Sequence, residues 1–166
     1  MIWFTGDQHF CHEAAAKFDT RNFTSVTKMN RKLIEQWNAV VKKDDVVWVL
    51  GDFFFTQDLK SLTKIVKVLN GKKYLIKGNH DSFYPGAYIN AGFSKYYDLP
   101  ILYNNVLLLS HEPVTTLSGD GLFNIHAHTH GRSFELRTPK HYCVSVDATE
   151  LRPVSLNEIY SSLYIK

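Results

Sequence analysis

The feature that most constrains this chain is a repeated pairing of a short apolar segment with a polar motif at its end. Segment 2–5 leads into Asp7 and His9, and segment 46–50 leads into Asp52. Short, β-prone apolar segments bounded by turn residues are typical of buried strands. Because ligand sites gather at the carboxyl ends of strands in α/β sheets, we expect these polar residues to meet in one site. The remaining motifs are Gly78-Asn79-His80-Asp81 after 74–76, Ser110-His111-Glu112 after 106–109, and His126-Ala127-His128-Thr129-His130 at the end of 122–126.

Segments with helical periodicity lie between or after these apolar segments. Apolar residues that recur at three- and four-residue spacing behind a capping residue predict a helix. Asn104-Asn105 indicates a hairpin turn between 101–103 and 106–109, and 142–146 is a further expected strand. This mixture predicts an α/β (or α+β) domain built in layers. The expected helices are Val26–Val40 after Thr24 or Ser25, 59–69 after Asp58, and a last helix from the Ser155-Leu156-Asn157-Glu158 capping box to about Tyr164.

Length and charge limit the classes of protein that fit. The 166 residues are 45% hydrophobic and 21% charged, which predicts one folded domain over residues 1–166. The net charge of +3 comes without a basic run, so nucleic acid is a permitted partner that the sequence does not indicate. Cys11 and Cys143 are too few for a disulfide framework. The sequence shows neither a signal peptide nor an apolar stretch of about 18 residues, so we expect a cytoplasmic protein without a membrane partner. The sequence does not predict the oligomeric state.

The residue types in the five motifs indicate a metal site. They combine one asparagine with several histidines and aspartates, and neither cysteine stands in a C-x-x-C arrangement. Mixed nitrogen and oxygen ligands suit Mn²⁺, Fe, Zn²⁺ or Ni²⁺ better than the all-oxygen sites of Ca²⁺ or the thiolate sites of structural zinc. Glycines before Asp7, Asp52 and Asn79 would let the chain leave each strand sharply while presenting the next side chain.

The order of these motifs resembles that of the calcineurin-like metallophosphoesterases. The matching residues are Asp7-Gln8-His9, Gly51-Asp52, Gly78-Asn79-His80-Asp81, His111 and His128-Thr129-His130. The chain is most similar to the small, capless bacterial and phage members of that superfamily. The resemblance implies a four-layer αββα sandwich, in which two mixed β-sheets are flanked by helices and a dimetal site lies at the strand ends.

The resemblance also implies a role for each motif residue. It assigns Asp7, His9 and His130 to a first metal, Asn79, His111 and His128 to a second metal, and Asp52 to a bridge between them. His80 would be a catalytic residue that binds no metal beside the scissile phosphate, and Asp81 would orient it. The family usually has glycine where this chain has Ala127. A frame that uses His126 and His128 would leave His130 spare; strand periodicity does not separate the two frames, and the family pattern favours His128 and His130.

Other residues near the motifs have weaker assignments. Arg21 and Arg132 could each grip a phosphate oxygen with a bidentate guanidinium. In Phe53-Phe54-Phe55 we expect mainly core packing, with one ring as a candidate for stacking on an aromatic group of the substrate. His12, His126 and His141 match no ligand position, and we expect structural or supporting roles for them.

The function that follows is hydrolysis of phosphate esters by a hydroxide shared between two divalent metal ions. Mn²⁺ is the favoured metal, with Fe, Zn²⁺ or Ni²⁺ as alternatives, and the partner is a small phosphate-ester or nucleotide substrate. We favour a phosphodiesterase; a phosphomonoesterase of the same fold and a non-catalytic metal-binding scaffold are the alternatives. A metallo-β-lactamase-like hydrolase is disfavoured because Thr129 stands where its motif requires aspartate.

Overall fold

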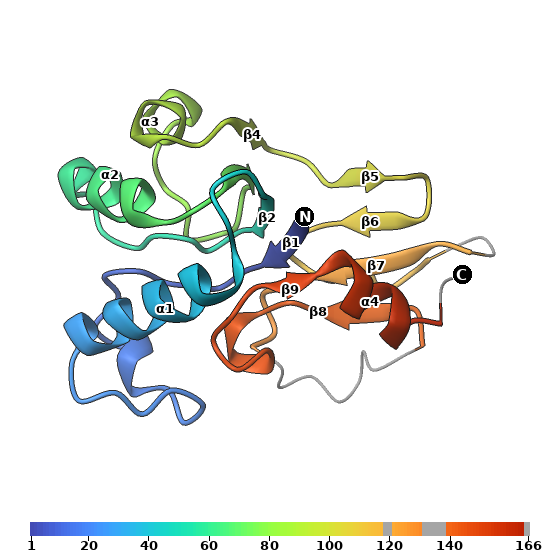
Figure 1. Cartoon of the computed structure of the whole chain (residues 1–166), viewed down its shortest axis with the longest axis horizontal. Coiled ribbons are helices and arrows are strands. Elements are labelled where there is room, and N and C mark those ends of the chain that lie inside the picture. Colours follow the sequence, from blue (N-terminus) through green and yellow to red (C-terminus); the bar gives the residue numbers. More distant parts are fainter. Residues whose placement is uncertain (118–120, 131–138, 165–166) are drawn as a thin grey trace.

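Two mixed β-sheets form the centre of the computed structural model, which describes residues 1–117, 121–130 and 139–164 (Figure 1). The first sheet has the order β4-β3-β2-β1-β9, in which β1 to β4 pair in parallel and β9 runs antiparallel to β1. Parallel strands place their carboxyl ends at one edge of the sheet, where the first three polar motifs begin. The strands of this sheet are β1 (Ile2–Thr5), β2 (Val46–Leu50), β3 (Lys72–Ile76), β4 (Lys95–Tyr97) and β9 (Val154–Ser155).

The second sheet has the order β5-β6-β7-β8. Its β5 and β6 form the expected hairpin, and Asn104 and Asn105 adopt φ angles of 49° and 60° in the turn between them. The pairs β6–β7 and β7–β8 are parallel, so the two histidine-bearing motifs also start at one edge of their sheet. Its strands are β5 (Ile101–Tyr103), β6 (Leu107–Leu109), β7 (Phe123–His126) and β8 (His141–Cys143).

The helices begin at the capping residues that the sequence indicates. The Ser25 hydroxyl accepts a hydrogen bond from the Lys28 amide, and the Asp58 carboxylate accepts one from the Lys60 amide. Ser155 and Glu158 form both halves of a capping box, so the three predicted helix starts are confirmed. The helical elements are η1 (Ala15–Lys17), α1 (Val26–Val40), α2 (Leu59–Val68), α3 (Pro85–Ala91), η2 (Val146–Ala148) and α4 (Leu156–Ser162).

Two apolar cores hold the layers together. Trp37, Leu62 and Tyr88 of α1, α2 and α3 pack in one core with residues of the first sheet. Leu50 and Ile125, which lie on different sheets, share the second core with residues of α4. Figure 1 shows α1, α2 and α3 together on one side of the molecule and α4 apart from them. The structure therefore confirms the predicted α/β fold of two mixed sheets flanked by helices.

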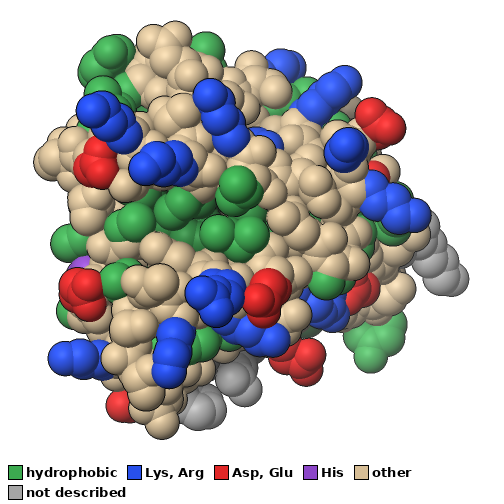
Figure 2. All heavy atoms as spheres, turned by 60° about the vertical axis from the view of Figure 1, so that its left-hand side comes forward, with side chains coloured by type: hydrophobic (Ala, Val, Ile, Leu, Met, Phe, Trp, Pro, Cys, Tyr) green, Lys and Arg blue, Asp and Glu red, His purple; other side chains and the backbone are tan. Residues whose placement is uncertain are grey.

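The surface reflects the mild charge of the sequence. On the face shown in Figure 2, lysine and arginine side chains stand at separate positions with acidic side chains between them, around a central group of hydrophobic side chains. Within the described part of the chain, no helix is long and apolar enough to cross a bilayer.

Candidate metal centre

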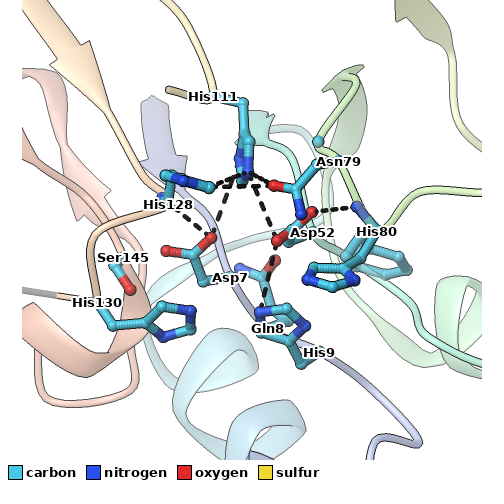
Figure 3. Close-up of polar contacts among 12 residues, drawn as sticks. Asp7, Gln8, His9, Asp52, Asn79, His80, His111, His128, His130 and Ser145 are labelled. Carbon is cyan, nitrogen blue, oxygen red and sulfur yellow. Dashed lines mark hydrogen bonds and ion pairs between the residues drawn. The ribbon is translucent and has the colours of Figure 1, made fainter. Parts of the chain in front are cut away.

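The strand ends of both sheets converge on one cluster of polar side chains (Figure 3). The first sheet contributes the residues that follow β1, β2 and β3, and the second sheet contributes those that follow β6 and β7. All seven residues that the family resemblance assigns to metals lie in this cluster. They are Asp7, His9, Asp52, Asn79, His111, His128 and His130.

The cluster contains two groups of side chains that could each hold a metal ion. Asp7, His9 and His130 form the first group, and each offers a ligand atom within 4.8 Å of those of the others. Asp52, His111 and His128 form the second group under the same limit. These two groups match the two metal sites that the family resemblance implies, with two differences. Asp52, the expected bridge, belongs to the second group only, and Asn79 belongs to neither group.

Asp52 and Asn79 lie where a bridge and a further ligand would be needed. Asp52 Oδ2 is 3.6 Å from His9 Nε2 of the first group and 3.5 Å from His111 Nε2 of the second group. Asn79 Oδ1 is 2.9 Å from His111 Nε2 and 3.0 Å from His128 Nδ1. The carboxylate of Asp52 can therefore reach cations in both groups, and the amide oxygen of Asn79 lies beside the second group.

The chemistry of the first group fits a divalent cation. Among the residues that the structure describes, His9 is buried with neither ring nitrogen in a hydrogen bond. Burial, followed by the positive charge of Arg21, lowers the pKa of His9 to about 2, so its ring is neutral and carries a free lone pair. Burial also raises the pKa of Asp7. A bound cation would satisfy the orphaned nitrogen and favour the ionised form of Asp7.

In two other histidines of the cluster, Nδ1 lies within hydrogen-bond distance of an oxygen outside the ligand groups. His111 Nδ1 lies 2.8 Å from the Leu50 carbonyl oxygen, and His130 Nδ1 lies 2.6 Å from Asp147 Oδ2. An Nδ1–H that donates to these oxygens leaves Nε2 with its lone pair for a metal. Both rings are therefore held by partners outside the ligand groups, in an orientation that would suit a metal ligand.

Several residues of the cluster have a strained backbone. A positive φ is uncommon for a residue with a Cβ and costs on the order of 1–3 kcal/mol. Such strain at several neighbouring side chains indicates that the fold, rather than local preference, sets their direction. The residues in question are Asp7 (57°), His9 (50°), Asp52 (53°), His128 (65°) and His130 (50°).

Two glycines allow the strand ends to approach each other. A Cβ on Gly51, whose φ is 83°, would lie 2.5 Å from His111 Nδ1. A Cβ on Gly78 would lie 2.3 Å from Asp52 Oδ1. The positive φ of Gly51 confirms the sharp turn expected after its strand, and Gly78 is needed for the close contact with Asp52.

The two possible frames of the last motif differ in position. His126 is 3% exposed, belongs to neither ligand group, and has its Nδ1 2.9 Å from the Ala127 carbonyl oxygen. His128 and His130 instead belong to the second and first groups. Ala127 is fully buried, and a Cβ on Gly6 would come within 2.5 Å of its methyl group. Because Gly6 has no side chain, alanine fits where the family usually has glycine.

His80 lies beside both groups without joining either. Its backbone amide donates to Asp52 Oδ1 at 2.8 Å, and its exposed ring lies 5.4 Å from the ring of His9. Asp81 is buried, and its carboxylate accepts hydrogen bonds from the backbone amides of Gly78, Asp52 and Phe53. The hydrogen bonds of the described residues include none from the His80 ring to Asp81, so Asp81 shapes the loop around Asp52. Burial raises the pKa of Asp81 to about 6.

Arg21 lies beneath the centre, where its charge is already partnered. Its guanidinium is buried and donates to Asp147 Oδ1 and Oδ2 at 2.8 Å and 2.7 Å. It also donates to the carbonyl oxygens of Asp7 and Gln8. In this arrangement Arg21 fixes the loop that carries Asp7 and His9, rather than presenting free donors to a phosphate. Arg132, the other arginine proposed for phosphate binding, lies outside the described residues.

Asp147 is a site residue that the sequence reasoning missed. Burial would raise its pKa, but hydrogen bonds from Arg21 and His130 hold that pKa below the ordinary value. It stands five residues after the start of the expected strand 142–146, directly beyond that strand's end. A polar residue directly after an apolar segment is the signal that marks the other motifs, and it could have identified Asp147.

An aromatic wall borders the first group. Phe53 and Phe54 are buried, which confirms core packing for two of the three adjacent rings. Phe55 is 38% exposed and stacks on His12 with ring centroids 3.5 Å apart. The His80 ring lies 5.6 Å from Phe55, so aromatic rings also border this histidine.

Comparison with known proteins identifies a family and a fold. A family model described as calcineurin-like phosphoesterase matches residues 1–158. The uncharacterized protein MJ1445 of Methanocaldococcus jannaschii is 34% identical over 95% of this chain and 88% of its own length. The gene 66 protein of Mycobacterium phage D29 is 30% identical over 89% of this chain and 88% of its own length. A crystal structure of an Aquifex aeolicus protein of unknown function has a TM-score of 0.75 at 24% identity, covering 97% of this chain and 98% of that one, and shares the fold.

Proposed function

The chain belongs to the calcineurin-like phosphoesterase family, which implies metal-dependent hydrolysis of phosphate esters, and from this premise we propose a phosphodiesterase with two divalent cations. The observation that carries the proposal is the position of Asp52. Its Oδ2 lies between His9 of the first group and His111 of the second, at 3.6 Å and 3.5 Å. A single carboxylate so placed can serve two cations at once.

The residues of the two groups would hold the cations and balance part of their charge. Mn²⁺ is the first choice, and Fe, Zn²⁺ and Ni²⁺ suit the same mixture of nitrogen and oxygen ligands. When bound, two such cations supply positive charge for the phosphate oxygens and make hydroxide available as a nucleophile near neutral pH. Only Asp7 and Asp52 among the proposed ligands are anionic, so the centre keeps a net positive charge that attracts a phosphate ester.

His80 would act on the leaving group. It lies beside the first group, its ring is exposed, and it is not needed as a ligand. A histidine in this place can donate a proton to the leaving oxygen or stabilise negative charge that develops there, which typically contributes about 10²–10⁴-fold in rate. The aromatic wall of Phe55 and His12 would then lie next to the departing group.

The proposal of a diester substrate is supported by the openness of the site. Asn79, His80 and His128 are exposed at the rim, so groups on both sides of a bound phosphate have room. A phosphomonoesterase remains the alternative, since the same ligand set serves both reactions.

The test is a comparison of hydrolysis with Mn²⁺ on bis(p-nitrophenyl) phosphate and p-nitrophenyl phosphate. We expect turnover of the diester to exceed that of the monoester, and His80→Ala to lower kcat by about 10²–10⁴-fold while both metals stay bound. Asp52→Asn should lose both metals together and abolish activity. Loss of only one metal from Asp52→Asn would contradict the bridging role. Preference for the monoester would indicate a phosphatase, and a metal-loaded protein that cleaves neither ester would indicate a scaffold.

A further inference from the structure

A pocket of about 430 Å³ opens beside the second ligand group. It lies between the ends of β3 and β6 and the connection from β4 to β5, and both Asn79 and His111 line it. This volume falls within the range of roughly 300–1,000 Å³ that is typical of small-molecule sites. The pocket therefore adjoins the place where a phosphate would be held at the metal centre.

The lining of the pocket is mainly apolar, with charges of both signs. Ile76, Pro100, Pro113 and Val114 provide the apolar surface. Lys77, Asp98 and Glu112 are the charged residues that line it, and all three are exposed. Two carboxylates against one ammonium group give this region a net negative charge, in contrast to the positive charge expected of the loaded metal centre. Such a pocket favours an uncharged group with an apolar face and repels a second phosphate.

The ring of His80 is surrounded by other residues than those that line the pocket. The ring neighbours of His80 are His9, His12 and Phe55, and none of these three lines the pocket. If His80 serves the leaving oxygen, the leaving group lies toward the aromatic wall. The ester arm that stays on phosphorus then lies toward Asn79, His111 and the pocket.

We propose that this pocket binds the retained arm of a phosphodiester, and that the arm is an uncharged group of nucleoside size. The proposal rests on the proposed function and narrows its substrate class. It predicts a preference for diesters with a single phosphate over substrates in which the retained arm carries another phosphate.

The test uses three diesters that share p-nitrophenolate as the leaving group and differ only in the retained arm. The arms are methyl, thymidine and 3′-phosphothymidine. With Mn²⁺, we expect kcat/KM for the thymidine ester to exceed that for the methyl ester by about tenfold or more, as is usual when a pocket contact is gained. The added 3′-phosphate should remove most of this advantage, and the double variant D98N/E112Q should restore it.

Val114→Trp fills the pocket and provides the decisive variant. The Val114 amide donates to Asn124 Oδ1, so its backbone is fixed independently of the side chain. We expect Val114→Trp to abolish the thymidine preference, so that kcat/KM for the thymidine ester falls to that for the methyl ester, and Val114→Ala to weaken the preference. Val68→Trp introduces the same change at an exposed position of α2 and should keep the preference. Equal kcat/KM for the methyl and thymidine esters in the wild-type protein would overturn the proposal.

Failure of the proposed function gives a different result. In that case the wild-type protein hydrolyses none of the three esters with Mn²⁺. The pocket is then tested by calorimetric titration with thymidine 5′-monophosphate and with methyl phosphate. Tighter binding of the nucleotide, lost in Val114→Trp and kept in Val68→Trp, supports the pocket; equal binding of the two phosphates refutes it.

Discussion

Asp147 connects the charge of a buried arginine to a ligand of the first group. One carboxylate accepts from the Arg21 guanidinium and from His130 Nδ1, and Arg21 in turn holds the carbonyl oxygen of Asp7. Two of the three members of the first group are thus positioned through one ion pair. A carboxylate behind a ligand histidine also fixes its tautomer and raises its basicity.

We therefore expect Asp147→Asn to weaken metal binding at the first group by about 10- to 100-fold, because the amide holds His130 less firmly and carries no charge. Titration calorimetry with Mn²⁺ and metal analysis after gel filtration measure the effect. Asp19→Asn, an exposed carboxylate on the neighbouring loop, is the matched control and should bind metal normally. Normal affinity in Asp147→Asn would show that His130 needs no such partner.

Strand ends are the elements on which the centre depends, and Gly51 combines a positive φ with close contacts. It follows β2 with a positive φ, and a Cβ there would contact both His111 Nδ1 and the Gly78 Cα. Two separate penalties follow for any side chain at this position: the left-handed backbone and the steric contact.

Gly51→Ala should lower the free energy of unfolding by about 1–3 kcal/mol or more and reduce metal binding at the second group, because His111 must move. Gly121→Ala separates the two penalties, since Gly121 has a φ of 80° and a Cβ there would meet nothing within 4 Å. Urea denaturation of both variants checks the stability, and metal analysis checks the site. Equal destabilisation with full metal content in both would show that the contact with His111 does not matter.

A second contact between elements lies at the amino ends of the strands, where Asp45 precedes β2. Its carboxylate accepts hydrogen bonds from the amino group of Met1, the Trp3 indole at 2.9 Å and the Lys42 amide at 2.8 Å. These bonds, that from Met1 first, lower the pKa of Asp45 to about 2. Because the unfolded-state pKa is about 3.9, the stabilisation is complete above that pH and is lost as the pH falls towards 2.

Asp45→Asn should therefore flatten the fall in stability between about pH 4 and pH 2 and lower stability at pH 7, where the charged acceptor is lost. Urea midpoints at several pH values measure both effects. Asp44→Asn changes the adjacent, exposed carboxylate and should leave the profile as in the wild-type protein. Parallel pH profiles for wild type and Asp45→Asn would contradict this account.

At the scale of the whole molecule, the candidate centre joins the two sheets. Asp7, His9 and Asp52 follow strands of the first sheet, and His128 and His130 follow a strand of the second. Each ligand group contains residues from both sheets, so a cation bound to either group would link them. A cation that binds the folded state and not the unfolded state stabilises the folded state by mass action.

We expect Mn²⁺ at about 100 times its dissociation constant to raise the free energy of unfolding by about 2.7 kcal/mol, and EDTA to reverse the change. Thermal unfolding followed by circular dichroism measures the shift. Asp52→Asn should show a much smaller shift because both groups lose a ligand. An identical Tm with Mn²⁺ and with EDTA in the wild-type protein would exclude metal binding at this junction.

Local patterns were sufficient for most elements. Capping residues such as Ser25, Asp58 and Ser155 fix where helices begin, because they satisfy amide groups that are adjacent in sequence. The short α3 and the three-residue β4 were not predicted. A seven-residue helix has too few turns for a clear period, and β4 is a partly exposed strand without strict alternation.

The sequence by itself determined the kind of chemistry: an ordered set of His, Asp and Asn motifs at the ends of apolar strands, on a chain of the calcineurin-like phosphoesterase family. Only the tertiary structure decided that these residues meet, that His130, which the family pattern favours over His126, lies with Asp7, and that Arg21 is already paired with Asp147. The physical reason is the distance along the chain over which the interactions act. Strand formation and helix capping depend on neighbours in the chain, whereas each ligand group joins residues from two sheets whose approach is set by strand pairing and by the space that Gly51 and Gly78 leave open.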